Sequence, residues 1–502
     1  MELKIRVTEK TLRVGGGRMV EVAEITLAGR MEAATLVDFR KTLSDLLAKG
    51  RKFVVLDFAG VAYISSTGLG GLVKYHEEFA RAGGGMCLVR VPETADHIIG
   101  LLGLSDVLAI FDRMEDAAGF FEVKLGITPA VAVKPISSPK AVPPSRPAAA
   151  GAGGTFPKAP GGTFPTTVPP KAPVAAPLVP RAAAAAPSIT GRQRMAQVRA
   201  EAISGKVMPA KSSASKTPKV LLAMPGEDDF SRLISAKIRF RSAGTAILMA
   251  ADSAMAVSLA AKERPDVVVV DFLLPGYEGV CERLKMEQAT GTLSVILLYP
   301  RNSNPDAVPG AQIMSNENIA EPFDLDHLVE LVQSEVERHQ REGAVLLHEF
   351  HIRFPSRQPE FERANEFFRK ALGQSIIGKN PESALAVTAA VREAIDNACR
   401  HGNKWQDKRY VDIFFLLDQE KMTLAVKDGG TGFNWRHFVE KVRTTRASEL
   451  ARQRPVDNPG GLGIALMISC MDRVVYNDIG NIITLTKLVR FAAPTAVPVA
   501  RS

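Results

Sequence analysis

The chain has 502 residues, of which 23% are charged, with a formal net charge of +9 and four cysteines. At ~150 residues per domain, this length allows about three domains. The cysteines form no CxxC pair, which argues against a disulfide framework or a thiolate metal site, and every apolar run is shorter than the ~20 residues of a membrane span. We therefore expect a soluble cytoplasmic protein with no membrane span.

The first predicted domain covers residues 1–126. The segments VEVAEITLAG and KFVVLDFAGV predict strands, whereas AATLVDFRKTLSDLLAKG and TGLGGLVKYHEEFARAGG have apolar residues at helical spacing. This alternation indicates an α/β domain with helices packed on a sheet. The stretch ISSTGLGG brings three hydroxyl side chains to the start of the second helix, where hydroxyls either cap the helix or receive a group.

Residues 127–215 are rich in proline, alanine and glycine, and predict a disordered basic linker. Nine basic residues and no acidic one lie between residues 125 and 200, so the positive net charge belongs to this segment. We therefore expect no direct nucleic-acid binding by a folded face. The alternative is a tether that touches RNA or acidic lipid. A disordered C-terminal tail is also expected, at residues 491–502.

The middle domain is expected at residues 216–343. Its short apolar segments KVLLAM, TAILMA, DVVVVDF and SVILLY predict buried strands, and SAMAVSLAAKE predicts one of the helices between them. Strands that are apolar on both faces are typical of a parallel sheet covered by helices on both sides. The pattern therefore predicts a doubly wound parallel sheet.

The third domain is expected at residues 344–490. It opens with the strand LLHEFHIRF and continues with the helices EFERANEFFRKALGQS and ESALAVTAAVREAIDNACRHG. The strands VDIFFLLD, MTLAVKDGG and NIITLTKLV follow. A few helices and a run of neighbouring strands predict an α+β sandwich.

Polar side chains recur in this third domain with helical spacing. Glu393, Asn397 and His401 follow one another at every fourth position, so they share one face of a helix. A row of solvated polar groups would have the same spacing. Asp428 follows an apolar strand, at a point where a carboxylate can face a ligand.

Two glycine-rich boxes lie further along the chain. Gly430 and Gly432 follow Asp428, and Gly461 and Gly463 lead into an apolar helix. Such glycines let a backbone approach a ligand closely, and a helix N-terminus can hold phosphate. With VREAIDNACRHGN, the boxes VKDGGTGF and NPGGLGIALMISC resemble the nucleotide-binding domain shared by histidine kinases, gyrase and Hsp90-type ATPases.

This resemblance implies an ATP site with Mg²⁺. Asn397 would coordinate the Mg²⁺ held by the phosphates, and Asp428 would accept from the adenine amino group. The residues that would line the pocket are Gly430, Gly432, Gly461 and Gly463. The arginine-rich interval at residues 434–458 would form a mobile lid, and its alternative is a solvated loop.

The layout of the third domain favours one branch of this superfamily. A histidine kinase needs a phosphoacceptor histidine on a helical hairpin, but His348 lies in a predicted strand ended by Pro355, where we expect a half-exposed side chain. The compact layout resembles the anti-sigma factor serine kinases instead. In that family, a glutamate at the position of Glu393 is taken as the general base that draws the proton from a serine hydroxyl.

The first domain resembles the STAS fold of anti-anti-sigma factors, which are the usual substrates of those kinases. In the stretch YISSTGLGG, Ser65 stands where the family has aspartate, and Ser66 takes the phosphoacceptor position. An exposed serine at a helix N-terminus suits a phosphate, because the helix dipole favours its negative charge. The alternative is that Ser65 or Ser66 only caps the helix, and both roles can hold at once.

The middle domain resembles a response-regulator receiver, with Asp271 at the acceptor position. Met224 and Pro225 replace the acidic pair that binds Mg²⁺ in receivers, and Glu321 replaces the lysine. Without those groups, nothing would neutralise a phosphoaspartate. We expect a degenerate receiver used for dimerisation or docking, unless residues 227–229 supply the metal ligands.

These resemblances together imply a bacterial partner-switching regulator. We expect an ATP-dependent protein serine kinase that phosphorylates a serine of an STAS domain, either its own or that of a separate antagonist. Its further partners would be a target such as a sigma factor and a PP2C-type phosphatase, and it could form a homodimer. The alternatives are a non-catalytic ATP-binding scaffold and, more weakly, a histidine kinase-like signalling protein.

Overall fold

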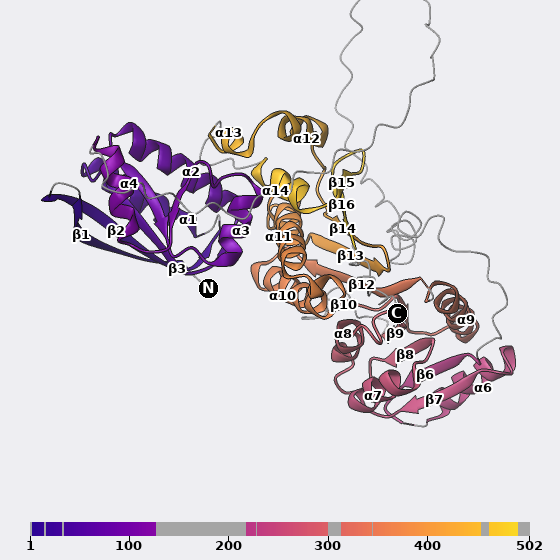
Figure 1. Cartoon of the computed structure of the whole chain (residues 1–502). Coiled ribbons are helices and arrows are strands. Elements are labelled where there is room, and N and C mark those ends of the chain that lie inside the picture. Colours follow the sequence, from indigo (N-terminus) through magenta and orange to yellow (C-terminus); the bar gives the residue numbers. More distant parts are fainter. Residues whose placement is uncertain are drawn as a thin grey trace, which may run out of the picture.

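The computed structural model describes residues 3–14, 17–32, 35–126, 217–226, 228–299, 313–343, 345–452 and 461–489. These residues form three sheets, one for each expected domain, and Figure 1 shows the third domain lying between the other two. The predicted linker and the predicted C-terminal tail lie outside the described residues.

The first domain is built on a five-stranded sheet with the order β1-β2-β3-β4-β5. β1 pairs antiparallel with β2, and the remaining pairs are parallel. The strands are β1 (Lys4–Val14), β2 (Arg18–Met31), β3 (Phe53–Ile64), β4 (Gly85–Val89) and β5 (Ala109–Phe111). The helices α1 (Leu36–Ala48), α2 (Ser66–Arg81) and α3 (Glu93–Leu101) share one apolar core with the sheet, and α4 (Asp116–Lys124) packs in a second core. The α/β prediction is confirmed.

The middle domain is a five-stranded parallel sheet with the order β11-β9-β8-β6-β7. Its strands are β6 (Lys219–Ala223), β7 (Ala246–Ala250), β8 (Val267–Asp271), β9 (Ser294–Tyr299) and β11 (Glu317–Ala320). Two separate apolar cores hold helices on the sheet: α6 (Asp229–Arg241) and α9 (Leu325–Glu342) belong to one, and α7 (Ser253–Glu263) and α8 (Glu278–Met286) to the other. This is the predicted doubly wound arrangement.

The third domain has an antiparallel six-stranded sheet with the order β10-β12-β13-β14-β16-β15. Its strands are β10 (Ile313–Met314), β12 (Leu346–Pro355), β13 (Tyr410–Asp418), β14 (Lys421–Lys427), β15 (Arg473–Tyr476) and β16 (Ile482–Leu488). The helices α10 (Gln358–Gln374), α11 (Pro381–Asn397) and α14 (Leu462–Cys470) pack on it through a shared core in which Phe350 stacks on Phe415 at 4.5 Å between ring centroids. The α+β prediction is confirmed.

A strand from the range predicted for the middle domain joins the sheet of the third domain. β10 lies between β9 and β11 in the chain, within the range predicted for the middle domain, yet it pairs with β12 of the third domain. Buried charges reinforce this junction, because Arg338 on α9 forms an ion pair with Glu349 on β12 at 3.4 Å. The two domains are therefore joined by backbone pairing as well as by side chains.

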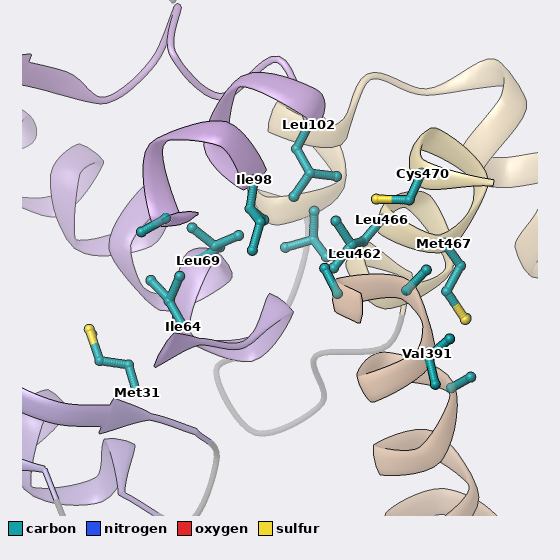
Figure 2. Close-up of a cluster of buried hydrophobic side chains, with 14 of the residues drawn as sticks. Met31, Ile64, Leu69, Ile98, Leu102, Val391, Leu462, Leu466, Met467 and Cys470 are labelled. Carbon is teal, nitrogen blue, oxygen red and sulfur yellow. The ribbon is translucent and has the colours of Figure 1, made fainter. Parts of the chain in front are cut away.

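The first and third domains also share their apolar core (Figure 2). Leu69, Ile98 and Leu102 of the first domain face Leu462 and Leu466 on α14. These side chains are almost fully buried, so the first domain is docked on the third through a dry contact. This contact brings the start of α2 to the third domain.

Candidate active site at the junction of the first and third domains

A cavity of about 560 Å³ lies in the third domain and reaches the start of α2. Its walls come from α11, from the loop after β14, from α14 and from two residues of the first domain, Ser66 and Thr67. The expected site residues that line it are Glu393, Asn397, His401, Asp428, Gly432, Gly461 and Gly463. Residues from two domains thus meet around one pocket.

Helix α11 presents Glu393 and Asn397 to the cavity. The Asn380 side chain caps the helix N-terminus by accepting from the Ser383 amide at 3.0 Å, and Pro381 stands at the first turn. Val391 and Ile395 are buried in the core, which fixes the rotation of the helix. A π-helical turn over Ala398–Gly402 follows, and it carries His401 to the cavity wall.

Glu393 lies at the contact between the two domains. It is only 4% exposed, and its Oε1 atom accepts a hydrogen bond from the Ser66 hydroxyl at 2.9 Å. Burial, together with the nearby Asp396 charge, raises the pKa of Glu393 to about 7. A carboxylate with this pKa can take up and release a proton near neutral pH.

The two adjacent serines of the first domain have different partners. Ser65 caps α2, since its hydroxyl accepts from the Gly68 amide at 3.2 Å and donates to the Met31 carbonyl at 3.1 Å. Because Ser65 supplies the cap, the Ser66 hydroxyl can donate its hydrogen bond to Glu393. The expectation that Ser66 is exposed is wrong for this structure, because the third domain covers it and leaves it 4% exposed.

Asp428 closes another side of the cavity. It follows β14, and its Oδ1 atom accepts from the Gly430 amide at 2.7 Å. Burial raises its pKa to about 6. Asn403, which our sequence reasoning missed, holds the loop in place: its side chain accepts from the Gly429 amide and donates to the Ser356 hydroxyl, both at 2.7 Å.

The glycines of the two boxes have distinct positions. Gly432 has φ +79°, and a Cβ atom there would lie 1.8 Å from the Ile479 carbonyl oxygen. A Cβ atom at Gly463 would lie 2.0 Å from Glu393 Oε1, so this glycine lets the carboxylate lie against α14. Gly461, with φ +115°, begins α14. Gly430 is not among the residues that line the cavity. Its backbone amide donates a hydrogen bond to the Asp428 carboxylate.

The arginine-rich interval after the first glycine box forms two helices, α12 (Trp435–Thr444) and α13 (Ala447–Arg452). Arg452 on α13 forms an ion pair with Glu77 on α2, so the predicted lid touches the first domain. Phe438 on α12 lines the cavity, and Phe433 and Tyr476 pack edge to face beside it. Residues 453–460 of this interval lie outside the described residues.

His348 lies in β12, as expected, but it is buried rather than half-exposed. Its Nε2 atom bonds to the Lys285 carbonyl at 2.6 Å, and burial lowers its pKa to about 4. It belongs to the contact between the middle and third domains and is not among the residues of the cavity. These features do not suit a phosphoacceptor.

Asp271 stands at the end of β8 and is nearly buried. Its Oδ1 atom accepts from the Leu273 amide at 2.9 Å. Burial raises its pKa, and the charges of Asp228 and Glu321 add to this. Asp228 itself caps α6 by accepting from the Ser231 amide at 2.8 Å, while Glu227 lies outside the described residues.

Comparison with known proteins identifies two of the domains. A model of the histidine kinase-like ATPase domain matches residues 354–487, and a model of the STAS domain matches residues 20–117. The serine-protein kinase RsbW of Listeria monocytogenes is 31% identical over 113 residues, which are 22% of this chain and 70% of that protein. In the part of the chain that the structure describes, no helix is both long enough and apolar enough to span a membrane.

Other relatives are regulators. The transcriptional regulatory protein PrrA of Mycobacterium tuberculosis is 30% identical over 122 residues, or 24% of this chain and 51% of that protein. RpaA of Synechocystis, a DNA-binding dual master transcriptional regulator, is 27% identical over 128 residues, or 25% and 51%. The chain thus spans about half the length of these regulators. A solved receiver domain of a Francisella response regulator is 26% identical with a TM-score of 0.21, over 24% of this chain and 98% of that one.

Proposed function

The chain belongs to the family of serine-protein kinases represented by RsbW, and from this premise we propose that it phosphorylates Ser66 of its own STAS domain with Mg·ATP. The chain combines this STAS domain with a receiver-like domain and a histidine kinase-like ATPase domain, as expected of a partner-switching regulator. One observation carries the proposal: the Ser66 hydroxyl donates to the buried Glu393 carboxylate at 2.9 Å.

The residues of the cavity suit a nucleotide with its metal ion. Asp428 offers a carboxylate that can accept from an adenine amino group, and its pKa of about 6 leaves it ionised at neutral pH. Asn397 offers an amide oxygen, which is a ligand that Mg²⁺ accepts. When bound, Mg²⁺ would neutralise charge on the phosphates. Gly461 stands at the N-cap of α14 and lines the cavity, where a phosphate would meet the backbone amides of the helix N-terminus.

The proposed reaction is a phosphoryl transfer with Glu393 as general base. Ser66 Oγ forms a bond to the γ-phosphorus, the bond from that phosphorus to the bridging oxygen breaks, and ADP leaves with the bridging oxygen. The hydroxyl proton passes to Glu393, which already accepts the hydrogen bond from that hydroxyl. Ser65 keeps the cap of α2 throughout, so Ser66 can react without loss of the helix end.

Phosphorylation of Ser66 would oppose docking of the STAS domain on the ATPase domain, because of the charge it adds. A phosphoserine carries about two negative charges, and at Ser66 these would lie beside Glu393 and Asp396 in a buried contact. We propose that the STAS domain then leaves and that the exposed ATPase surface binds another target, such as a sigma factor. A PP2C-type phosphatase would restore the docked state.

The test is the intact mass of the full chain after incubation with Mg·ATP. We expect one added phosphate in the native chain and none in Ser66→Ala or Glu393→Gln. Thr42→Val is the matched control, because it removes a hydroxyl on α1 of the same domain, outside the cavity, and should still gain the phosphate. A phosphate that persists in Ser66→Ala would refute the proposed substrate.

A second measurement separates the kinase from a non-catalytic scaffold. Glu393→Gln preserves the shape of the side chain and removes its basicity, so it should still bind a fluorescent ATP analogue as tightly as the native chain. If the native chain binds the nucleotide but gains no phosphate, the scaffold describes the protein better.

A further inference from the structure

A ring of four charged side chains lies beside the docked Ser66. Arg30 and Glu32 come from the end of β2 and the residue after it, in the STAS domain. Glu362 on α10 and Arg392 on α11 come from the ATPase domain. Arg392 is buried, with 7% of its surface exposed, whereas the Arg30 and Glu362 side chains keep 23% and 33% of theirs, so the ring is partly removed from water around Arg392.

The four side chains alternate in charge, and each domain supplies one arginine and one glutamate. Arg30 donates to Glu32 Oε1 and to Glu362 Oε2, both at 2.8 Å. Arg392 donates to Glu32 Oε1 at 2.6 Å and to Glu362 Oε1 at 3.0 Å. Each arginine therefore contacts one carboxylate of its own domain and one of the other domain. The ring is complete only when the two domains are docked.

Aromatic rings hold the arginines in place. The Arg392 guanidinium lies 4.4 Å from the ring centre of Tyr63, in the STAS domain, and 4.8 Å from that of Phe361. Arg30 lies 5.4 Å from the same Tyr63 ring. Such cation–π contacts strengthen when the cation is desolvated, and they fix the orientation of the planar guanidinium.

We propose that this charge ring is the specificity element by which the ATPase domain selects its STAS substrate, an inference that rests on the proposed function. It accepts an STAS domain that carries arginine and glutamate at the positions of Arg30 and Glu32, with an aromatic ring at that of Tyr63. A desolvated charge that meets no partner, or a like charge, costs far more than a missing neutral contact, so other STAS domains are rejected.

The test uses two full-length chains in one mixture, an enzyme chain with Ser66→Ala and a substrate chain with Glu393→Gln. Both docking sites start occupied by their own STAS domains, so transfer between the chains is slow. Glu32→Lys in the enzyme chain should release its own STAS domain. Arg392→Glu in the substrate chain should release the intact STAS domain that carries Ser66.

This placement should speed phosphorylation of the substrate chain by about tenfold or more, within the range expected for coupled charge pairs. The reciprocal placement, Arg392→Glu in the enzyme and Glu32→Lys in the substrate, again brings opposite charges together across the interface, so it should speed transfer as well. A mixture with Arg392→Glu in both chains also releases both STAS domains, but it sets the new carboxylate of the enzyme against Glu32 of the substrate and should give no faster transfer than the parent pair. A rate in this mixture equal to that of the first placement would overturn the proposal.

A readout without nucleotide separates this inference from the kinase proposal. Hydrogen exchange at the first turn of α2 in the full chain should rise in Glu32→Gln and in Arg392→Gln, and the double variant should exchange no faster than the single ones. Arg369→Gln removes an exposed ion pair with Glu366 on the same α10 and should leave this exchange unchanged. Unchanged exchange in Glu32→Gln and Arg392→Gln would refute the charge ring even if Ser66 is phosphorylated.

Discussion

At the scale of single residues, Glu393 has a pKa that is set by two domains. Burial under the STAS domain and the charge of Asp396 raise it, whereas the hydrogen bond from Ser66 lowers it. A carboxyl group with a raised pKa stays mostly protonated until the pH exceeds that pKa. While it is protonated, it cannot act as a base. The environment of Glu393 therefore makes the proposed transfer depend on pH.

We predict that the first-turnover rate of Ser66 phosphorylation rises with pH around a midpoint near 7, the pKa of Glu393. Below the midpoint the carboxyl is neutral and accepts no proton, and above it the base is fully available. Rapid quench between about pH 6 and about pH 8, with saturating Mg·ATP, measures this. A rate that is flat across this interval would contradict the role of Glu393.

Gly463→Ala should slow the same reaction by about tenfold to a hundredfold, because misplacement of a catalytic group by about 1 Å has effects of this size. The new Cβ atom would lie 2.0 Å from Glu393 Oε1 and would displace the carboxylate from Ser66. Gly373→Ala is the matched control, since no atom beyond its own stretch of helix lies within 4 Å of its Cβ position. A native rate in Gly463→Ala would mean that Glu393 moves aside without consequence.

The sequence predicted the residues of the cavity better than their surroundings. Glu393, Asn397 and Asp428 were expected in one pocket because their three boxes together resemble a nucleotide-binding domain, and all three line the cavity. The burial of Ser66 could not be predicted, since its cover lies 327 positions away in the chain. Asn403 was missed because its role is to hold a loop, which no short motif records.

At the scale of elements, long periodic segments were predicted and short or edge segments were missed. β1 was not expected, because seven of its eleven residues are exposed at the sheet edge and the apolar alternation is weak. β10 has two residues and β15 has four, too few for a recognisable period. The lid interval was taken as one mobile segment, although its described part forms α12 and α13.

Arg338→Met should destabilise the junction of the receiver-like and ATPase domains. Arg338 on α9 is nearly buried and forms ion pairs with three carboxylates, those of Glu335, Glu342 and Glu349. Removing the shared cation from a buried ion-pair network costs about 3–5 kcal/mol. Thermal unfolding followed by circular dichroism should give a lower midpoint, while Arg341→Met, on the exposed side of the same helix, should not change it. If Arg338→Met unfolds at the same midpoint temperature as the native chain, the ion pairs of Arg338 do not stabilise the junction.

At the scale of the whole molecule, both outer domains are bound to the ATPase domain in different ways. The receiver-like domain is attached through the pairing of β10 with β12 and through Glu349. Among the described residues, no strand of the STAS domain joins the ATPase sheet, and the STAS domain is attached through the apolar core, the charge ring and the contact of Ser66 with Glu393. Because side-chain contacts can separate without breaking a sheet, we expect only the STAS domain to leave after phosphorylation.

Small-angle X-ray scattering should detect this release. Addition of Mg·ATP should increase the radius of gyration of the full chain, because the charge of phosphoserine beside Glu393 and Asp396 opposes docking. Ser66→Ala should bind nucleotide and keep the compact radius. An equal expansion in Ser66→Ala would mean that nucleotide binding itself, rather than the phosphate, separates the domains.

The docked Ser66 also sets how much output one molecule can give. A kinase that acts on a free pool of substrate turns over many times and multiplies its input. A copy of this chain that modifies only its own docked serine, against Glu393, can carry one phosphate at a time and reacts again only after a phosphatase has removed it. The number of marks would then equal the number of copies, and the response would grow linearly with expression until every copy is marked. The number of phosphorylated copies, and so the output, is then limited by the amount of the protein, and the input signal is not amplified.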